Sequence, residues 1–201
     1  MNTAPVAWVP QGDTPWARGA ATALAASGWR VALGVREVPA SSEEGIHPFL
    51  RGEGPEGLAA CTVEAADRLG GFDALLPWSP LPLPSRLWLD LEERDWRAAL
   101  DPLREDLAES LRCSLPYLLG KPGAQILFLL PEAPRGEIPA PQEAARLARF
   151  AVARSLREEL DPFGVRVRVL LTSHLDAEAG CAAARVLATS AETPFCLRSP
   201  R

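Results

Sequence analysis

The chain has 201 residues, 47% of them hydrophobic, and a formal net charge of -5. The length fits a single domain over residues 1–201 with a sizeable core. The acidic balance argues against a nucleic-acid partner, and no apolar run is long enough to cross a bilayer.

The four cysteines are widely scattered and form no CxxC pair. This spacing argues against a zinc site or a redox-active pair, so we expect reduced thiols and no metal. The N-terminus carries no basic segment of the kind that opens a signal peptide, and we expect a cytoplasmic protein.

Strands and helices are expected to alternate in the first half of the chain. The predicted elements are a strand at 6–9, a helix at 16–27, a strand at 30–35, a helix at 58–69 and a strand at 73–76. Asp13 and Thr14 are expected to cap the first helix, and Gly28 to end it. Residues 38–57 are rich in Pro, Ser, Glu and Gly, which predicts a surface loop.

The second half continues the alternation with longer helices. The predicted elements are a helix at 92–119, a strand at 123–129, a helix at 141–160, a turn at 161–164, a strand at 165–171, a short helix at 182–190 and an edge strand at 194–197. Leucines at three- and four-residue steps mark one face of the long helix, and Asp101 with Pro102 is expected to restart it. Such alternation predicts a Rossmann-like three-layer α/β/α sandwich with a parallel sheet.

Four stretches carry a resemblance to a known family. They are residues 20–31, residues 71–76, Asp95–Trp96 with the helix that follows, and the segment AVARSLREELDPFGVRV at 151–167. In order and spacing they resemble the short-chain dehydrogenase/reductase family over nearly the whole chain. The resemblance implies an NAD(P)-dependent oxidoreductase fold, here shortened at the substrate lid and the C-terminus.

The family's cofactor loop reads Thr-Gly-x-x-x-Gly-x-Gly, and its glycines let the backbone approach a pyrophosphate. It aligns with residues 10–17, so Gln11, Pro15 and Ala17 stand at the glycine positions. The family's Asn-Asn-Ala-Gly loop aligns with residues 77–80, which read PWSP. A proline offers no amide and Asp13 adds a negative charge, so we predict that this chain binds no dinucleotide.

The resemblance also gives the positions of the family's catalytic residues. The tyrosine and lysine align with Gln142 and Arg146, the serine with Leu130 or a neighbour, and the asparagine with Leu103 or Arg104. A glutamine amide does not titrate, and a guanidinium does not reproduce a compact ammonium. We therefore predict a catalytically inactive chain.

In the family, the two long helices pair with a second subunit. Their leucine stripe and small-residue face are retained here, which predicts an interface at Leu100, Leu103, Leu107, Leu111, Leu115, Ala148, Ala151 and Ser155. The predicted partner is an active homologue, which would carry NAD or NADP in an alcohol dehydrogenase or ketoreductase complex, or a second copy of this chain.

Two other functions remain open from the sequence. One is an enzyme with a repurposed pocket, for which Asp13, His174, Gln142 and Arg146 are the candidates. The other is a small-ligand binding or regulatory module that keeps the crevice at the carboxyl ends of the strands. Arg36, just after the second strand, stands where some relatives contact an NADP phosphate, although a solvated arginine is the simpler interpretation.

Overall fold

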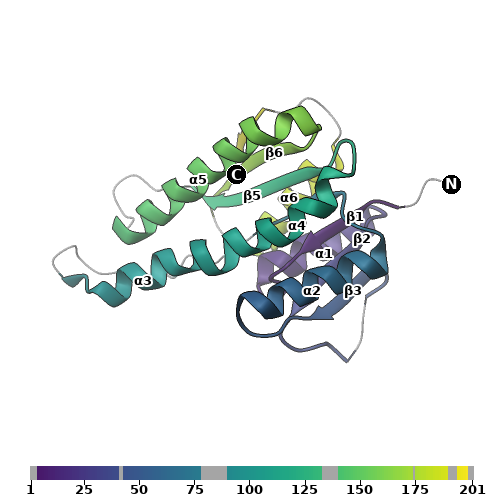
Figure 1. Cartoon of the computed structure of the whole chain (residues 1–201), viewed down its shortest axis with the longest axis horizontal. Helices are drawn as coiled ribbons and strands as arrows, with labels where there is room; N and C mark the ends of the chain where they lie inside the picture. Colours follow the sequence, from purple (N-terminus) through teal and green to yellow (C-terminus); the bar gives the residue numbers. More distant parts are fainter. Residues whose placement is uncertain are drawn as a thin grey trace.

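A parallel sheet of seven strands forms the centre of the computed structural model, which describes residues 4–40, 43–77, 90–132, 140–173, 175–189 and 194–198 (Figure 1). The strand order is β3-β2-β1-β4-β5-β6-β7. The strands are β1 Val6–Val9, β2 Arg30–Val35, β3 Ile46–Leu50, β4 Ala74–Leu75, β5 Gln125–Pro131, β6 Arg166–Thr172 and β7 Cys196–Arg198. Each neighbouring pair is parallel, which confirms the predicted sheet.

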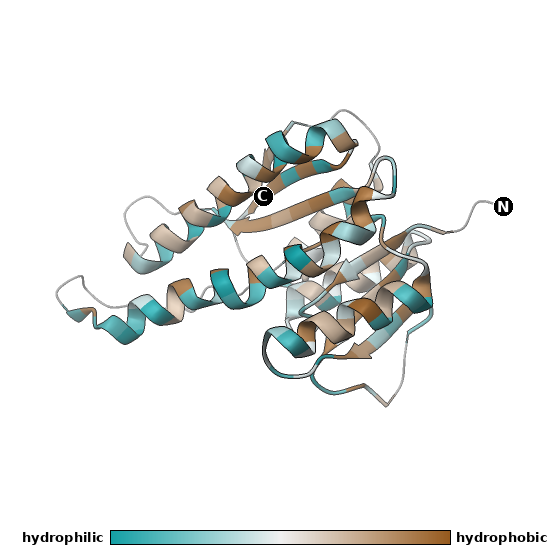
Figure 2. Cartoon of the chain, in the orientation of Figure 1, coloured by the Kyte–Doolittle hydropathy of each residue, from teal (hydrophilic) through white to brown (hydrophobic). Residues whose placement is uncertain are grey.

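Helices connect the strands and form the two outer layers. They are α1 Pro15–Ala26, α2 Gly54–Leu69, α3 Glu93–Pro102, α4 Glu109–Leu119, α5 Ala140–Leu160 and α6 Ala177–Ala188, with a π-helical segment, η2, at Leu103–Ala108 and a 3-10 turn, η3, at Asp161–Phe163. One core lies between the sheet and α1 with α6, and the other between the sheet and α2, α4 and α5. Figure 2 shows the hydrophobic strands between these layers.

Side chains of β1 alternate between the two cores, as a strand with period two requires. Val6 and Trp8 point to the core under α2, α4 and α5, whereas Ala7 and Val9 point to the core under α1 and α6. Trp8 stacks on Phe72, with ring centroids 5.6 Å apart. Both faces of the strand are therefore buried, which accounts for its continuous apolar run.

Three elements differ from the sequence prediction. The segment 38–57 is not a continuous loop, because it holds β3 and the first turn of α2. Pro48 and His47 both lie within β3. β3 is an edge strand, and such a position tolerates a proline, which has no N–H to donate. The last helix begins at Ala177, earlier than the predicted 182.

Asp101 does not cap a second helix. The chain continues from α3 into η2 and α4 without an intervening turn, and Pro102 lies inside the helical run. Proline removes one helical hydrogen bond and crowds the preceding carbonyl, and the wider π turn that follows accommodates this.

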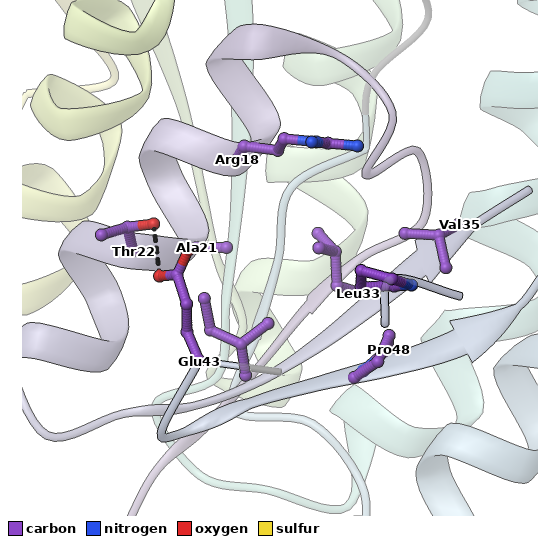
Figure 3. A pocket seen from close by; sticks show the side chains of 9 residues that line it. Arg18, Ala21, Thr22, Leu33, Val35, Glu43 and Pro48 are labelled. Carbon is purple, nitrogen blue, oxygen red and sulfur yellow. Dashed lines mark hydrogen bonds between the residues drawn. The ribbon is translucent and has the colours of Figure 1, made fainter. Parts of the chain in front are cut away.

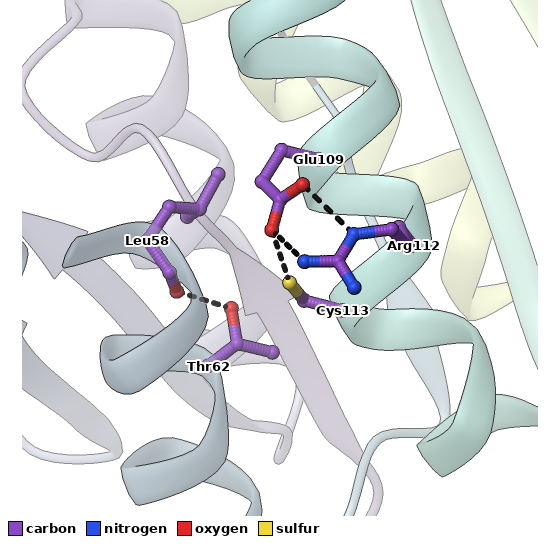
Figure 4. Close-up of polar contacts among 5 residues, drawn as sticks. All are labelled: Leu58, Thr62, Glu109, Arg112 and Cys113. Carbon is purple, nitrogen blue, oxygen red and sulfur yellow. Dashed lines mark hydrogen bonds and ion pairs between the residues drawn. The ribbon is translucent and has the colours of Figure 1, made fainter. Parts of the chain in front are cut away.

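Two close contacts between helices hold the outer layers together. α1 and α6 pack at Gly19 and Gly180, where a Cβ on Gly180 would lie 2.0 Å from the carbonyl oxygen of Trp16. On the other face, α2 meets α4 (Figure 4). There the Thr62 hydroxyl donates to its own helix, and Glu109 accepts hydrogen bonds from neighbours on α4.

Candidate functional site: the crevice at the carboxyl ends of the strands

The turn between β1 and α1 lies against the end of β2. The amide of Gly12 donates to the carbonyl of Gly34 at 2.6 Å. A Cβ on Gly34 would lie 2.6 Å from the carbonyl oxygen of Pro10, and a Cβ on Gly12 would lie 2.4 Å from Cγ of Leu33. These two glycines therefore permit the turn to pack on the strand. Gln11, at a glycine position of the family loop, is buried.

Few amides at the start of α1 remain for an anion. Thr14 is the N-cap, as predicted, and its hydroxyl accepts from the amide of Ala17 at 3.4 Å. Pro15 has no amide, and the Trp16 side chain is only 1% exposed. A helix N-terminus binds phosphate through its free amides. At the start of α1, Pro15 has no N–H, and the N–H of Ala17 is already bonded to the Thr14 hydroxyl.

Asp13 does not cap α1 and instead binds the chain after β2. Its carboxylate accepts the backbone N–H of Arg36, with distances of 3.3 and 3.2 Å to the two oxygens. An exposed carboxylate thus lies between the β1–α1 turn and the segment after β2. A phosphate placed at this turn would lie near this negative charge.

A salt bridge joins the β3–α2 connection to the π-helical segment η2. Nη2 of Arg51 lies 2.8 Å from Oδ1 of Asp106, and the two side chains are 13% and 25% exposed. Arg149 of α5 is 2% exposed; burial lowers its pKa to about 10, and the negative charge of Asp106 acts in the opposite direction. Sequence reasoning missed this cluster because its members come from three distant segments.

The predicted catalytic positions are all described. Leu130 is fully buried in β5, and Gln142 is buried in the first turn of α5. Arg146, one turn further, binds Glu143 through two hydrogen bonds of 2.7 and 2.6 Å. These bonds from Arg146 lower the pKa of the Glu143 carboxyl, so the guanidinium is engaged by an acid of its own helix. The three positions therefore carry the amide of Gln142, the hydrocarbon side chain of Leu130 and the cation of Arg146, which is already paired with Glu143.

The fourth catalytic position, Leu103, is the first residue of the π-helical segment. π turns inside α-helices are frequent at functional sites. The backbone irregularity is present, but Leu103 carries no polar group and packs against the core.

Two predicted positions lie outside the described residues. They are His174, a candidate for a repurposed pocket, and the part of the PWSP segment from residue 78 onward. Within the described ranges, no three or more His, Cys, Asp or Glu residues gather as a metal site. No helix in the described part of the chain has the length and apolar composition needed to cross a membrane.

Neither a family model nor a curated protein sequence matches this chain. Solved structures do. A short-chain dehydrogenase from Streptomyces avermitilis superposes with a TM-score of 0.80 at 16% identity, over 98% of this chain and 88% of that chain. The NADH-dependent reductase A1-R′, responsible for alginate metabolism, gives a TM-score of 0.79 at 11% identity, over 98% of this chain and 96% of that chain. A metagenomic short-chain oxidoreductase in complex with NADP gives a TM-score of 0.74 at 19% identity, over 97% of this chain and 95% of that chain.

The chain has the short-chain dehydrogenase fold. This agreement covers nearly the whole chain and confirms the predicted Rossmann-like α/β architecture. In this chain β6 ends at Thr172 and α6 begins at Ala177, so the connection that would hold a substrate lid is short.

Within this short-chain dehydrogenase fold, the predicted interface residues divide into two groups. Leu107 and Leu111 are 2% and 6% exposed, and Leu103 and Leu115 pack against the same core. Leu107 and Leu111 therefore belong to the interior of the domain instead of the interface where we expected them, whereas Leu103 and Leu115 are only half-buried.

The remaining predicted residues lie on the outer side of the helices. Leu100 is 37% exposed, Ala148 is half-buried, and Ala151 and Ser155 are exposed. Leu147, which is not among the predicted interface residues, is 53% exposed on α5. α3 projects beyond the end of the sheet (Figure 1), so these helices present an outer surface away from the core.

Proposed function

We propose that this chain is a non-catalytic, cytoplasmic subunit with a short-chain dehydrogenase fold, and that it binds no dinucleotide itself. It associates through the outer sides of α3, α4 and α5 with an active homologue or with a second copy. In the first case the complex is an NAD(P)-dependent oxidoreductase of the alcohol dehydrogenase or ketoreductase type.

The β1–α1 turn is the observation that carries this proposal. Pro15 removes one amide, Thr14 occupies that of Ala17, and the carboxylate of Asp13 lies beside the turn. A pyrophosphate needs free amides and a neutral or positive surrounding. The composition of the catalytic positions agrees, since Gln142 and Leu130 have no group that titrates near neutral pH.

The association is supported by the outer surface of the long helices. Leu147 and Leu100 expose apolar side chains there, and Ala151 allows close approach of another helix. Large apolar side chains that are exposed on the outer sides of helices are available for association.

The cofactor part is tested by titrating the purified chain with NADH and NADPH while following nicotinamide fluorescence. We expect no saturable signal. Saturation at micromolar nucleotide would overturn the proposal and return the enzyme with a repurposed pocket to first place.

The association part is tested by light scattering after size-exclusion chromatography, with the chain alone and co-expressed with an intact short-chain dehydrogenase from the same source. We expect a complex that Leu147→Glu weakens. Phe163→Glu is the matched control, because Phe163 is 59% exposed outside these helices. A monomer in both preparations, or equal loss in both variants, would contradict the proposed interface.

A further inference from the structure

A cavity lies on the flank of α1 that faces β2 and β3 (Figure 3). Its volume is about 250 Å³, and it is lined by Arg18, Ala21, Thr22, Leu33, Val35, Pro39, Glu43, Ile46 and Pro48. The lining includes neither the β1–α1 turn nor any of the predicted catalytic positions. The cavity therefore adjoins the β1–α1 turn at Leu33 without including it.

The arrangement of the sheet leaves this place open. α6 packs on α1 and also contacts β5, so it lies on the side of α1 that faces the middle of the sheet. β3 is the edge strand on the opposite side. The flank of α1 that faces this edge is consequently not covered by α6, and a hollow forms between it and strands β2 and β3.

The floor of the cavity is apolar and held in place by the core. Leu33 and Val35 are 7% and 2% exposed, so their side chains have little freedom. Ile46 and Pro48 continue the floor on β3 and are half-buried. A short aliphatic chain would replace water on this floor with a gain roughly proportional to the apolar area covered.

Polar groups of opposite charge stand at two places on the rim. The hydroxyl of Thr22 donates to Oε2 of Glu43 at 3.0 Å, which orients the carboxylate beside the cavity (Figure 3). Arg18 stands apart from this pair, one turn earlier on α1, and no hydrogen bond or ion pair of its guanidinium is found within the described ranges. Arg18 and Thr22, which holds Glu43, are one turn apart on α1, a distance of about 6 Å along the helix.

We propose that this cavity binds a short amphipathic carboxylate that carries an amine at its far end, that is, an ω-amino carboxylic acid. The ligand carboxylate pairs with Arg18, its ammonium donates to Glu43, and its methylene chain covers Leu33 and Ile46. This inference rests on the cavity alone and does not depend on the proposed function of the crevice. Its failure would leave the association and cofactor predictions unchanged.

The experiment follows the amide resonances of the 15N-labelled chain during titration with 6-aminohexanoate. We expect saturable shifts at Arg18, Thr22 and Leu33, and weaker binding of hexanoate and of hexylamine, which each lack one charged end. Arg18→Gln should weaken binding about fivefold, the contribution of one partly exposed charge pair. Thr22→Val should weaken it as well, because Glu43 loses the hydroxyl that orients it.

Arg36→Gln is the matched control. Arg36 is also an exposed arginine near the end of β2, but it does not line the cavity. An unchanged affinity in this variant, together with the loss in Arg18→Gln, supports the proposal. The absence of saturable shifts, equal binding of all three probes, or equal loss in the two arginine variants would overturn it. Thermal unfolding of each variant shows whether it is folded.

Discussion

The contact between α1 and α6 gives the sharpest prediction for stability. A methyl group on Gly180 would lie 2.0 Å from the carbonyl oxygen of Trp16 and 2.5 Å from the amide nitrogen of Ala20. Both atoms belong to the backbone of α1, so no side-chain rotation relieves the clash. Gly180→Ala must therefore separate the two helices.

The expected loss is about 2–3 kcal/mol, the upper part of the range for overpacked interiors. For a chain of this length it corresponds to a decrease of about 6 °C in the unfolding temperature. Urea unfolding followed by circular dichroism measures the free energy, and a constant m value shows that the unfolded state has not changed.

Gly120→Ala is the control for the same change of residue. Gly120 has a φ of -82° at the end of α4, and a Cβ there would meet nothing within 4 Å. Alanine in such a conformation should leave stability unchanged or raise it slightly. If Gly180→Ala were as stable as Gly120→Ala, the close helix contact in this structure would be refuted.

Three further outcomes follow from charged and titratable groups. Burial lowers the pKa of His47, and two nearby arginines lower it further. The free energy of unfolding should therefore fall as the pH drops below about 6.5, because the unfolded chain takes up the proton first. His47→Gln should make this fall shallower in urea titrations, and an unchanged slope would speak against the interpretation. Asp106→Asn removes the acid beside Arg51 and Arg149 and should lower the free energy of unfolding by about 2 kcal/mol. Glu93→Gln, in an exposed pair with Arg97, should lower it by under about 0.5 kcal/mol. Similar losses in the two variants would contradict the role of the cluster. Burial raises the pKa of the Cys113 thiol to about 11. Iodoacetamide at neutral pH should therefore modify the exposed Cys196 before Cys113, which peptide mass spectrometry can show. The reverse order would disprove the interpretation.

Much of the fold could be predicted because its signals are local. β2 at Arg30–Val35 and the helix that ends at Leu160 follow from apolar runs and from glycine or proline at their ends. β3 could not be found in this way, because Ile46-His47-Pro48 has neither alternation nor a continuous apolar run. It is a strand only because β2 provides a partner for it.

The start of α6 was placed too late for a related reason. Gly180 weakens a helix that is judged by propensity alone. In the structure this glycine is required, because α1 approaches so closely at that point. A residue that appears to break the helix in the sequence therefore allows two helices to pack.

The candidate site was only partly accessible from the sequence. Spacing, counted back from Gly28 and from Leu160, predicted Pro15 and Gln142 as the family's loop and tyrosine positions, and the structure places them in the first turns of α1 and α5. Periodicity placed Leu107 on an apolar stripe but could not decide whether the sheet or a partner covers it. The salt bridge between Arg51 and Asp106 joins residues far apart in the chain, and no local pattern predicts such a pair.

The pairing of α1 with α6 also bears on how the chain folds during synthesis. α1 is complete at Ala26, but the helix that covers it is not complete until Ala188 has been made. At the usual speed of a ribosome that interval lasts on the order of 10 to 30 seconds. During this time the alanine-rich side of α1 stays open to other molecules. A nascent chain of this protein should therefore depend on chaperones over that period, and removal of its last helix would leave the first one permanently uncovered.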